Sequence, residues 1–198
     1  MHTGIVLRQQ FPLTHKVTIL DRALGVIEGF VHSTEDIQRL CHSAYATYQV
    51  RRYKNRYFIT DVSTQHVPFA WARHDILFLH HVLEMTYAFM PQALSQATVF
   101  DLIASLYETQ ACDDRSTKTF FLARLFLAFG TYPEDETTFS WLQRITTAPV
   151  DGAHHSPLHL EAESRLNAWL VRCAQLHPQY NDLKTIHFLT ESGRHGTS

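Results

Sequence analysis

The sequence has few of the residues from which disulfide frameworks and phosphate-binding loops are built. Three cysteines occur among 198 residues, far apart at positions 41, 112 and 173. An odd number of scattered cysteines argues against a disulfide framework and fits a reducing compartment. The seven glycines are also scattered singly, so neither a dinucleotide-binding fingerprint nor a P-loop is present.

Long apolar runs are missing as well. No stretch approaches the roughly 18 consecutive apolar residues that a spanning helix needs. The first ten residues have no basic segment that leads into an apolar run, so no secretory signal is predicted. We therefore expect a cytoplasmic protein without a membrane anchor.

Catalytic and metal-binding patterns are equally scarce. The dipeptide Cys41-His42 is not a catalytic pair, because adjacent side chains rarely point at each other. The 14 histidines invite a test for zinc, but His80 or His81 with Glu84 supplies too few ligands, and the three histidines in 154–159 have no cysteine nearby. We expect no catalytic residues, no cofactor and no metal, with a small histidine-dependent metalloenzyme as an alternative.

What the chain does have is apolar content and an uneven charge. Hydrophobic residues make up 45% and aromatic residues 12%, enough to offset the entropy of ordering the chain. Residues 1–70 hold eight Lys or Arg against five Asp or Glu, whereas residues 71–198 hold nine against fourteen. Five cations and no acidic residue lie from Arg39 to Phe58, which is typical of contact with a polyanion.

The first 70 residues read as short strands separated by turns. The expected strands are Thr3–Leu7, Lys16–Leu20, Gly25–Val31, Tyr45–Arg52 and Tyr57–Val62, with a turn at Lys54-Asn55. Five short strands predict a small barrel, for which the five-stranded OB type is the best-known binding example. Periodicity alone does not separate it from an SH3-like barrel.

After Pro68 the apolar spacing becomes helical. The expected helices are Trp71–Met90, Thr98–Tyr107, Phe120–Phe129, Glu136–Ile145 and Glu161–Leu176. The third is apolar nearly all round, with Ser116 as a candidate cap and Gly130 as its stop. The sequence thus predicts an α+β fold: an OB-like barrel domain at residues 1–69 and an all-α helical domain at residues 70–198.

Cations and rings alternate on the predicted fourth and fifth strands. The candidate nucleic-acid-binding residues are Arg51, Arg52, Tyr53, Lys54, Arg56 and Tyr57. The cations would hold phosphates while Tyr53 or Tyr57 stacks a base. Because a strand sends alternate residues to opposite faces, some rings of this run must belong to the core. The alternative is a solvated hairpin packed by its aromatic residues.

The order of these segments resembles the RecO family of bacterial recombination mediators, an OB barrel followed by a helical domain. The similar segments are Thr3–Leu7, Lys16–Leu20 and Gly25-Val26 for the first hairpin, Arg56–Val62 with Arg73-His74-Asp75 for the fifth strand and first long helix, Phe120–Gly130 with Pro133 for the core helix, and Leu183–Leu189 for the C-terminal motif. The similarity spans nearly the whole chain.

The resemblance implies a DNA repair protein that binds and anneals single-stranded DNA, with RecR and the single-strand binding protein SSB as partners. Lys118 and Arg124 match the cations that receive the acidic C-terminal tail of SSB. The family's basic segment after the third strand is replaced by acidic Val31–Asp36, and no cysteine lies between Gly130 and Glu161, so zinc is not expected. A protein-only adaptor, whose helical half binds a partner and whose barrel is structural, is the alternative function.

Overall fold

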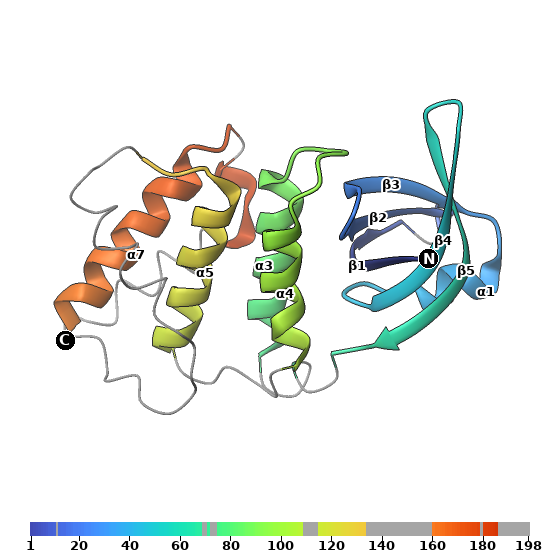
Figure 1. Ribbon diagram of the computed structural model, residues 1–198. Coiled ribbons are helices and arrows are strands. Elements are labelled where there is room, and N and C mark those ends of the chain that lie inside the picture. Colours follow the sequence, from blue (N-terminus) through green and yellow to red (C-terminus); the bar gives the residue numbers. More distant parts are fainter. Residues whose placement is uncertain are drawn as a thin grey trace. The chain divides into compact units, whose positions relative to one another are not determined.

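The computed structural model describes residues 1–10, 12–68, 71, 75–108, 115–133, 160–178 and 180–185. A closed five-stranded barrel is followed by helices (Figure 1), so the predicted α+β class is confirmed. The elements are β1 (His2–Gln9), β2 (Lys16–Asp21), β3 (Gly25–Val31), α1 (Thr34–Arg39), β4 (Tyr45–Tyr53), β5 (Arg56–His66), α3 (Ile76–Phe89), α4 (Ala97–Glu108), α5 (Arg115–Phe129), α7 (Leu160–Gln175) and the 3-10 turn η1 (Tyr180–Asp182). The expected helix at 136–145 lies outside the described residues.

The strand order around the barrel is β1-β2-β3-β5-β4, and β4 closes the barrel on β1. Every pair is antiparallel except β3 with β5. This arrangement is consistent with an OB-like barrel. Alternate residues of each strand point inward and form one apolar core, which includes Val6, Val17, Ile19, Ile27, Val31, Tyr48, Ile59 and Val62.

A tyrosine and a carboxylate are buried together in the barrel. The Tyr48 hydroxyl donates to Oδ2 of Asp21 at 2.8 Å, and two backbone N–H groups of the following turn donate to Oδ1. Burial, followed by the adjacent carboxylate, raises the pKa of Tyr48 well above its usual value, so the hydroxyl keeps its proton. A Cβ at Gly4 would lie 2.5 Å from this hydroxyl, which explains a glycine within β1.

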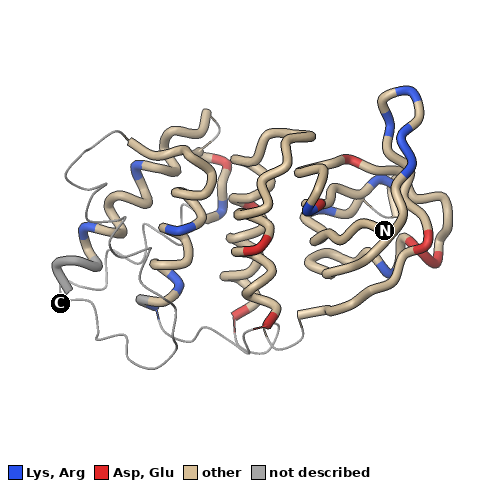
Figure 2. The backbone as a smooth tube through the Cα atoms, in the orientation of Figure 1, with Lys and Arg blue, Asp and Glu red and all other residues tan. Residues whose placement is uncertain are grey.

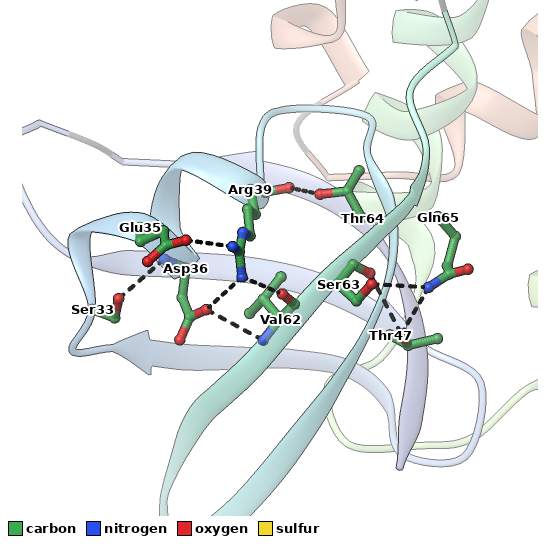
Figure 3. Close-up of polar contacts among 9 residues, drawn as sticks. All are labelled: Ser33, Glu35, Asp36, Arg39, Thr47, Val62, Ser63, Thr64 and Gln65. Atoms are coloured by element: carbon green, nitrogen blue, oxygen red, sulfur yellow. Dashed lines mark hydrogen bonds and ion pairs between the residues drawn. The ribbon is translucent and has the colours of Figure 1, made fainter.

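Helix α1 was not predicted, although its sequence carries a capping signal. The Ser33 hydroxyl accepts from the Asp36 N–H at 3.2 Å, the Ser-x-x-Asp spacing of a helix start. Arg39 then pairs with Glu35 and donates to the Val62 carbonyl, while the Asp36 carboxylate accepts from the Val62 N–H (Figure 3). The acidic segment after β3 therefore leads into a short helix that is hydrogen-bonded to β5, and Arg39 has a structural role.

Contacts divide the chain into two compact units, Met1–Ala111 and Cys112–Ser198. Helices α3 and α4 therefore belong with the barrel. The Tyr107 hydroxyl donates to the Ser43 carbonyl at 2.8 Å, and the Trp71 indole donates to the Leu106 carbonyl at the same distance. The domain boundary predicted between residues 69 and 70 stays a prediction.

In the second unit α5 packs against α7. The rings of Phe126 and Trp169 meet edge to face with centroids 6.4 Å apart. As predicted, α5 ends at Phe129, before Gly130 with its φ of +70°. It begins at Arg115, so Ser116 lies inside the helix and not at its cap. Within the described ranges, no helix has the length and apolar character needed to cross a bilayer.

His42 and His80 meet where the barrel contacts α3, with ring centroids 4.9 Å apart. Partial desolvation, and then repulsion from a charged His80, lowers the pKa of His42, and a backbone hydrogen bond at Leu7 offsets this only in part. Because the unfolded chain has the higher pKa, it takes up the proton first as the pH falls. The free energy of unfolding of Met1–Ala111 should therefore decrease as the pH drops below about 6.5.

Urea unfolding at about pH 5.5 and pH 7.5 measures this dependence on either side of the histidine range. His42→Gln should reduce the difference in unfolding free energy between the two pH values. His80→Gln should recover part of the loss at the lower pH, because it removes the repelling charge. Equal pH dependence in all three proteins would show that this histidine pair does not affect stability.

Candidate nucleic-acid interface

The β4–β5 hairpin turns at Lys54 and Asn55, as predicted. Their φ angles are +46° and +60°, and Tyr53 pairs with Arg56 across the turn. Two consecutive left-handed residues are the geometry of a type I′ turn, whose twist matches that of the flanking strands. The hairpin projects from the barrel (Figure 1), and Lys and Arg residues gather along it (Figure 2). The predicted cations therefore stand on a protruding element.

Alternation divides the six predicted residues between two faces. Ile59 is buried in the barrel, so its neighbour Phe58 points outward and shares that face with Arg56 on β5 and with Arg51 and Tyr53 on β4. Arg52 lies opposite Tyr57 on the other face, where Tyr57 packs against the barrel core. One surface therefore holds Arg51, Tyr53 and Arg56, but not Arg52 and Tyr57, while Lys54 lies in the turn.

Cations rest on rings along the hairpin. Lys54 Nζ lies 5.3 Å from the ring centre of Tyr53, and the guanidinium of Arg52 lies 5.8 Å from that of Tyr57. Tyr53 is 61% exposed, so its ring stands open to a ligand at the tip. These contacts hold positive charge beside aromatic faces, which is the pairing that single-stranded nucleic acids use.

A continuous row of side chains crosses four strands on the outer face. Lys16 of β2 pairs with Phe30 of β3, Phe30 pairs with Phe58 of β5, and Phe58 pairs with Arg51 of β4. The two phenyl centroids are 6.3 Å apart. We call Lys16, Phe30, Phe58 and Arg51 the outer row. It places two rings between two cations, over three inter-strand spacings that amount to about 14 Å.

Further side chains border the outer row. The guanidinium of Arg56 lies 5.6 Å from the ring centre of Phe30, and the His32 ring stacks on Phe58 at 5.4 Å with planes inclined by 12°. Glu28 also lies on this face and pairs with Lys16 at 2.6 Å. The positive charge of the face therefore comes mainly from Arg51 and Arg56.

Sequence reasoning missed part of this surface. Lys16, Phe30 and His32 were not among the predicted binding residues, because they come from strands far from the basic run in sequence. One signal was available. Ile27 and Val31 are apolar and point into the barrel, and Phe30 lies an odd number of residues from both, so it points to the outer face. Which strand would lie beside it was not evident from periodicity.

Lys118 and Arg124 both lie on α5 and are partly buried. Arg124 follows Lys118 by six positions, which places the two about 120° apart around the helix axis. They are therefore not on one face. A peptide that touches both would cross α5 at an angle.

The histidines form no metal centre in the part of the chain that the structure describes, since no group of three His, Cys, Asp or Glu there is arranged to hold an ion. His80 contacts His42, and the histidines at 154–159 lie outside the described residues. The site built from the described residues is thus a cationic, ring-bearing strand surface. Comparison of the sequence with models of known protein families and with curated proteins found no match.

Proposed function

We propose that this protein binds single-stranded DNA through the outer row and the β4–β5 hairpin, and that it acts as a noncatalytic recombination mediator of the RecO type. The observation that carries the proposal is the outer row. It holds two partly buried rings, Phe30 and Phe58, side by side between Lys16 and Arg51. Ring faces accept any base by stacking, and cations accept phosphates independently of sequence.

The ring faces favour an unpaired strand over a duplex. A base in a duplex has both faces covered by its neighbours, whereas a base in a single strand is free to stack on a protein ring. Arg51, Arg56 and Lys54 surround the rings with charge for the backbone. The phosphate contacts therefore supply affinity for any nucleic acid, and the rings add affinity for single strands alone.

RecR and the tail of SSB are proposed as partners on the strength of the sequence resemblance. The acidic tail would bind the second unit through Lys118 and Arg124, crossing α5. Contact with Arg52 remains part of the proposal at the edge of the hairpin, where Arg52 is exposed. Tyr57 packs against the barrel core and is the alternative stacking ring, on the opposite face.

Fluorescence anisotropy of a labelled oligothymidine, titrated at several salt concentrations, tests the function. We expect Arg51→Ala, Arg52→Ala, Lys54→Ala and Arg56→Ala together to weaken binding. If all four cations contact phosphates, the slope of log Kobs against log salt should become shallower by about 3, since each single-strand phosphate contact contributes about 0.7. Adding an SSB tail peptide tests whether Lys118→Ala with Arg124→Ala removes tail binding while leaving DNA binding intact.

Glu28→Gln is the matched control, and its expected effect on DNA binding has the opposite direction to that of the fourfold variant. It keeps the size of the side chain but removes the charge that pairs with Lys16, so DNA binding should tighten. Unchanged affinity and unchanged salt slope in the fourfold variant would refute the DNA surface. Tail binding without DNA binding would favour the protein-only adaptor.

A further inference from the structure

A pocket lies between the barrel and α4, near the end of β2 that is farther from Lys16 and the outer row. It is an open pocket of about 280 Å³, and all of its lining residues belong to the unit Met1–Ala111. The residues that determine its chemistry are Arg22, Tyr45, Phe100, Asp101, Ser105 and Glu108. Its volume is slightly below the range of sites for cofactors and drug-sized ligands, and fits a single amino-acid side chain.

One wall of the pocket is fixed by an ion pair. The Arg22 guanidinium contacts both carboxylate oxygens of Asp101, with Nε to Oδ1 at 3.1 Å and an Nη nitrogen to Oδ2 at 3.2 Å. The backbone of Arg22 is held as well, by the Thr3 carbonyl at 3.0 Å and the Ser95 hydroxyl at 3.1 Å. An anionic ligand would have to compete with Asp101 for this arginine, so the pocket does not favour anions.

The remaining charge is negative. Glu108 follows Asp101 by seven residues on α4, so both carboxylates lie on the same side of the helix about two turns apart. Within the described residues no hydrogen bond or ion pair to Glu108 is found. With one cation and two carboxylates, the lining carries a formal charge of −1.

Two aromatic residues complete the lining. The rings of Tyr45 and Phe100 have centroids 6.1 Å apart and are tilted by 41°. Phe100 is buried and backs the pocket, whereas Tyr45 is partly exposed and offers its ring to a ligand. An aromatic ring beside a carboxylate is the environment that a guanidinium group prefers, because its plane stacks on the ring while its N–H groups reach the oxygens. A lysine ammonium would gain the charge contact but not the planar stacking.

We propose that this pocket binds the side chain of an arginine presented by a partner protein. Charge complementarity identifies the occupant: a nucleotide would bring its phosphates against Asp101 and Glu108, whereas a guanidinium neutralises the lining. The inference does not depend on DNA binding. Lys16 begins β2 and Arg22 follows its end, so the pocket is about 20 Å along the strand from the outer row. Both sites are therefore open to simultaneous occupation.

NMR titration of the full chain, labelled with ¹⁵N, tests the proposal with acetyl-Gly-Arg-Gly-amide as the probe. The matched control peptide replaces arginine by citrulline, which has nearly the same shape but no charge. We expect the arginine peptide to shift the amide signals of Phe100, Ala104, Ser105 and Glu108 saturably, and the citrulline peptide to leave them in place. Glu108→Gln should weaken binding of the arginine peptide by about two- to fivefold, the range of a solvent-exposed ion pair.

Ala104→Leu provides a second variant, because it fills the pocket without changing charge, and it should abolish the saturable shifts. The spectrum of each variant also reports whether the unit is folded. Equal binding of the citrulline peptide, shifts confined to other residues, or full arginine binding by folded Ala104→Leu would each overturn the proposal. The same holds if oligothymidine, and not the arginine peptide, shifts these four signals.

Discussion

Gly25→Ala should lower the free energy of unfolding of Met1–Ala111 by about 2 to 5 kcal/mol. Gly25 begins β3 with a φ of +76°, a conformation that costs a residue with a Cβ about 1 to 2 kcal/mol. A Cβ there would also lie 2.1 Å from the carbonyl oxygen of Leu94. Because that atom is backbone, no rotamer change relieves the overlap, and overpacking adds its own cost.

The contact at Gly25 matters because the α3–α4 loop pairs with the barrel there. Val26 forms a parallel bridge with Gln92, and the Ala93 N–H donates to the Val26 carbonyl at 2.9 Å. Moving the loop away to make room for a methyl group would break both contacts. The substitution should therefore loosen α3 and α4 from the barrel as well as strain the turn.

Gly130→Ala separates the two causes. Gly130 has a similar φ of +70°, but nothing lies within 4 Å of a Cβ built there. Gly130→Ala should therefore lower the free energy of unfolding of the second unit by the conformational cost alone, about 1 to 2 kcal/mol. Urea unfolding, followed by circular dichroism, measures both variants. Should Gly25→Ala prove as mild as Gly130→Ala, the close approach of Leu94 would not be a determinant of stability.

Local sequence signals predicted the barrel, and the structure explains why they succeeded. The five runs of strand-forming residues all became strands, and the Lys54-Asn55 turn joined the last two with a two-residue loop. Such features depend on neighbours within a few residues, so a single sequence contains them. Helix α1 carried a local signal too, in Ser33 and Asp36, but its six residues were too few to show a helical period.

The assignment of faces could not be predicted in the same way. Between Arg51 and Phe58, the odd-numbered and the even-numbered residues each include a cation and a ring. Alternation therefore does not show which of the two groups of side chains points inward. Burial of Ile59 decides it, and this depends on how β5 is placed between β3 and β4. The outer row joins Lys16 to Phe58, 42 residues apart, and is visible only once the register of four strands is known.

The placement of Phe30 and Phe58 on the outer face leads to the second prediction of a large effect, a loss of DNA binding. If the outer row stacks bases, Phe58→Ala and Phe30→Ala should each weaken binding of labelled oligothymidine by about 5- to 150-fold. This range corresponds to the 1 to 3 kcal/mol that stacking of one base on one ring contributes. Because the two rings touch, the double variant should lose less than the product of the single losses.

Tyr57→Leu is the matched control, since Tyr57 lies on the opposite face and packs against the core. Leucine keeps an apolar side chain there and removes the ring, so DNA affinity should change by less than about threefold if only the outer face stacks bases. A loss at Tyr57→Leu as large as at Phe58→Ala, with Phe58→Ala itself neutral, would move the stacking surface to the other face of the hairpin.

Salt dependence distinguishes what the rings do from what the cations do. Loss of a stacking ring removes no phosphate contact, so Phe58→Ala should lower the affinity equally at every salt concentration and leave the slope of log Kobs unchanged. Arg51→Ala should instead make the slope shallower by about 0.7, because one fewer counterion is released. If both variants altered the slope alike, Phe58 would act by holding Arg51 in place across the strand pair, and not by stacking a base.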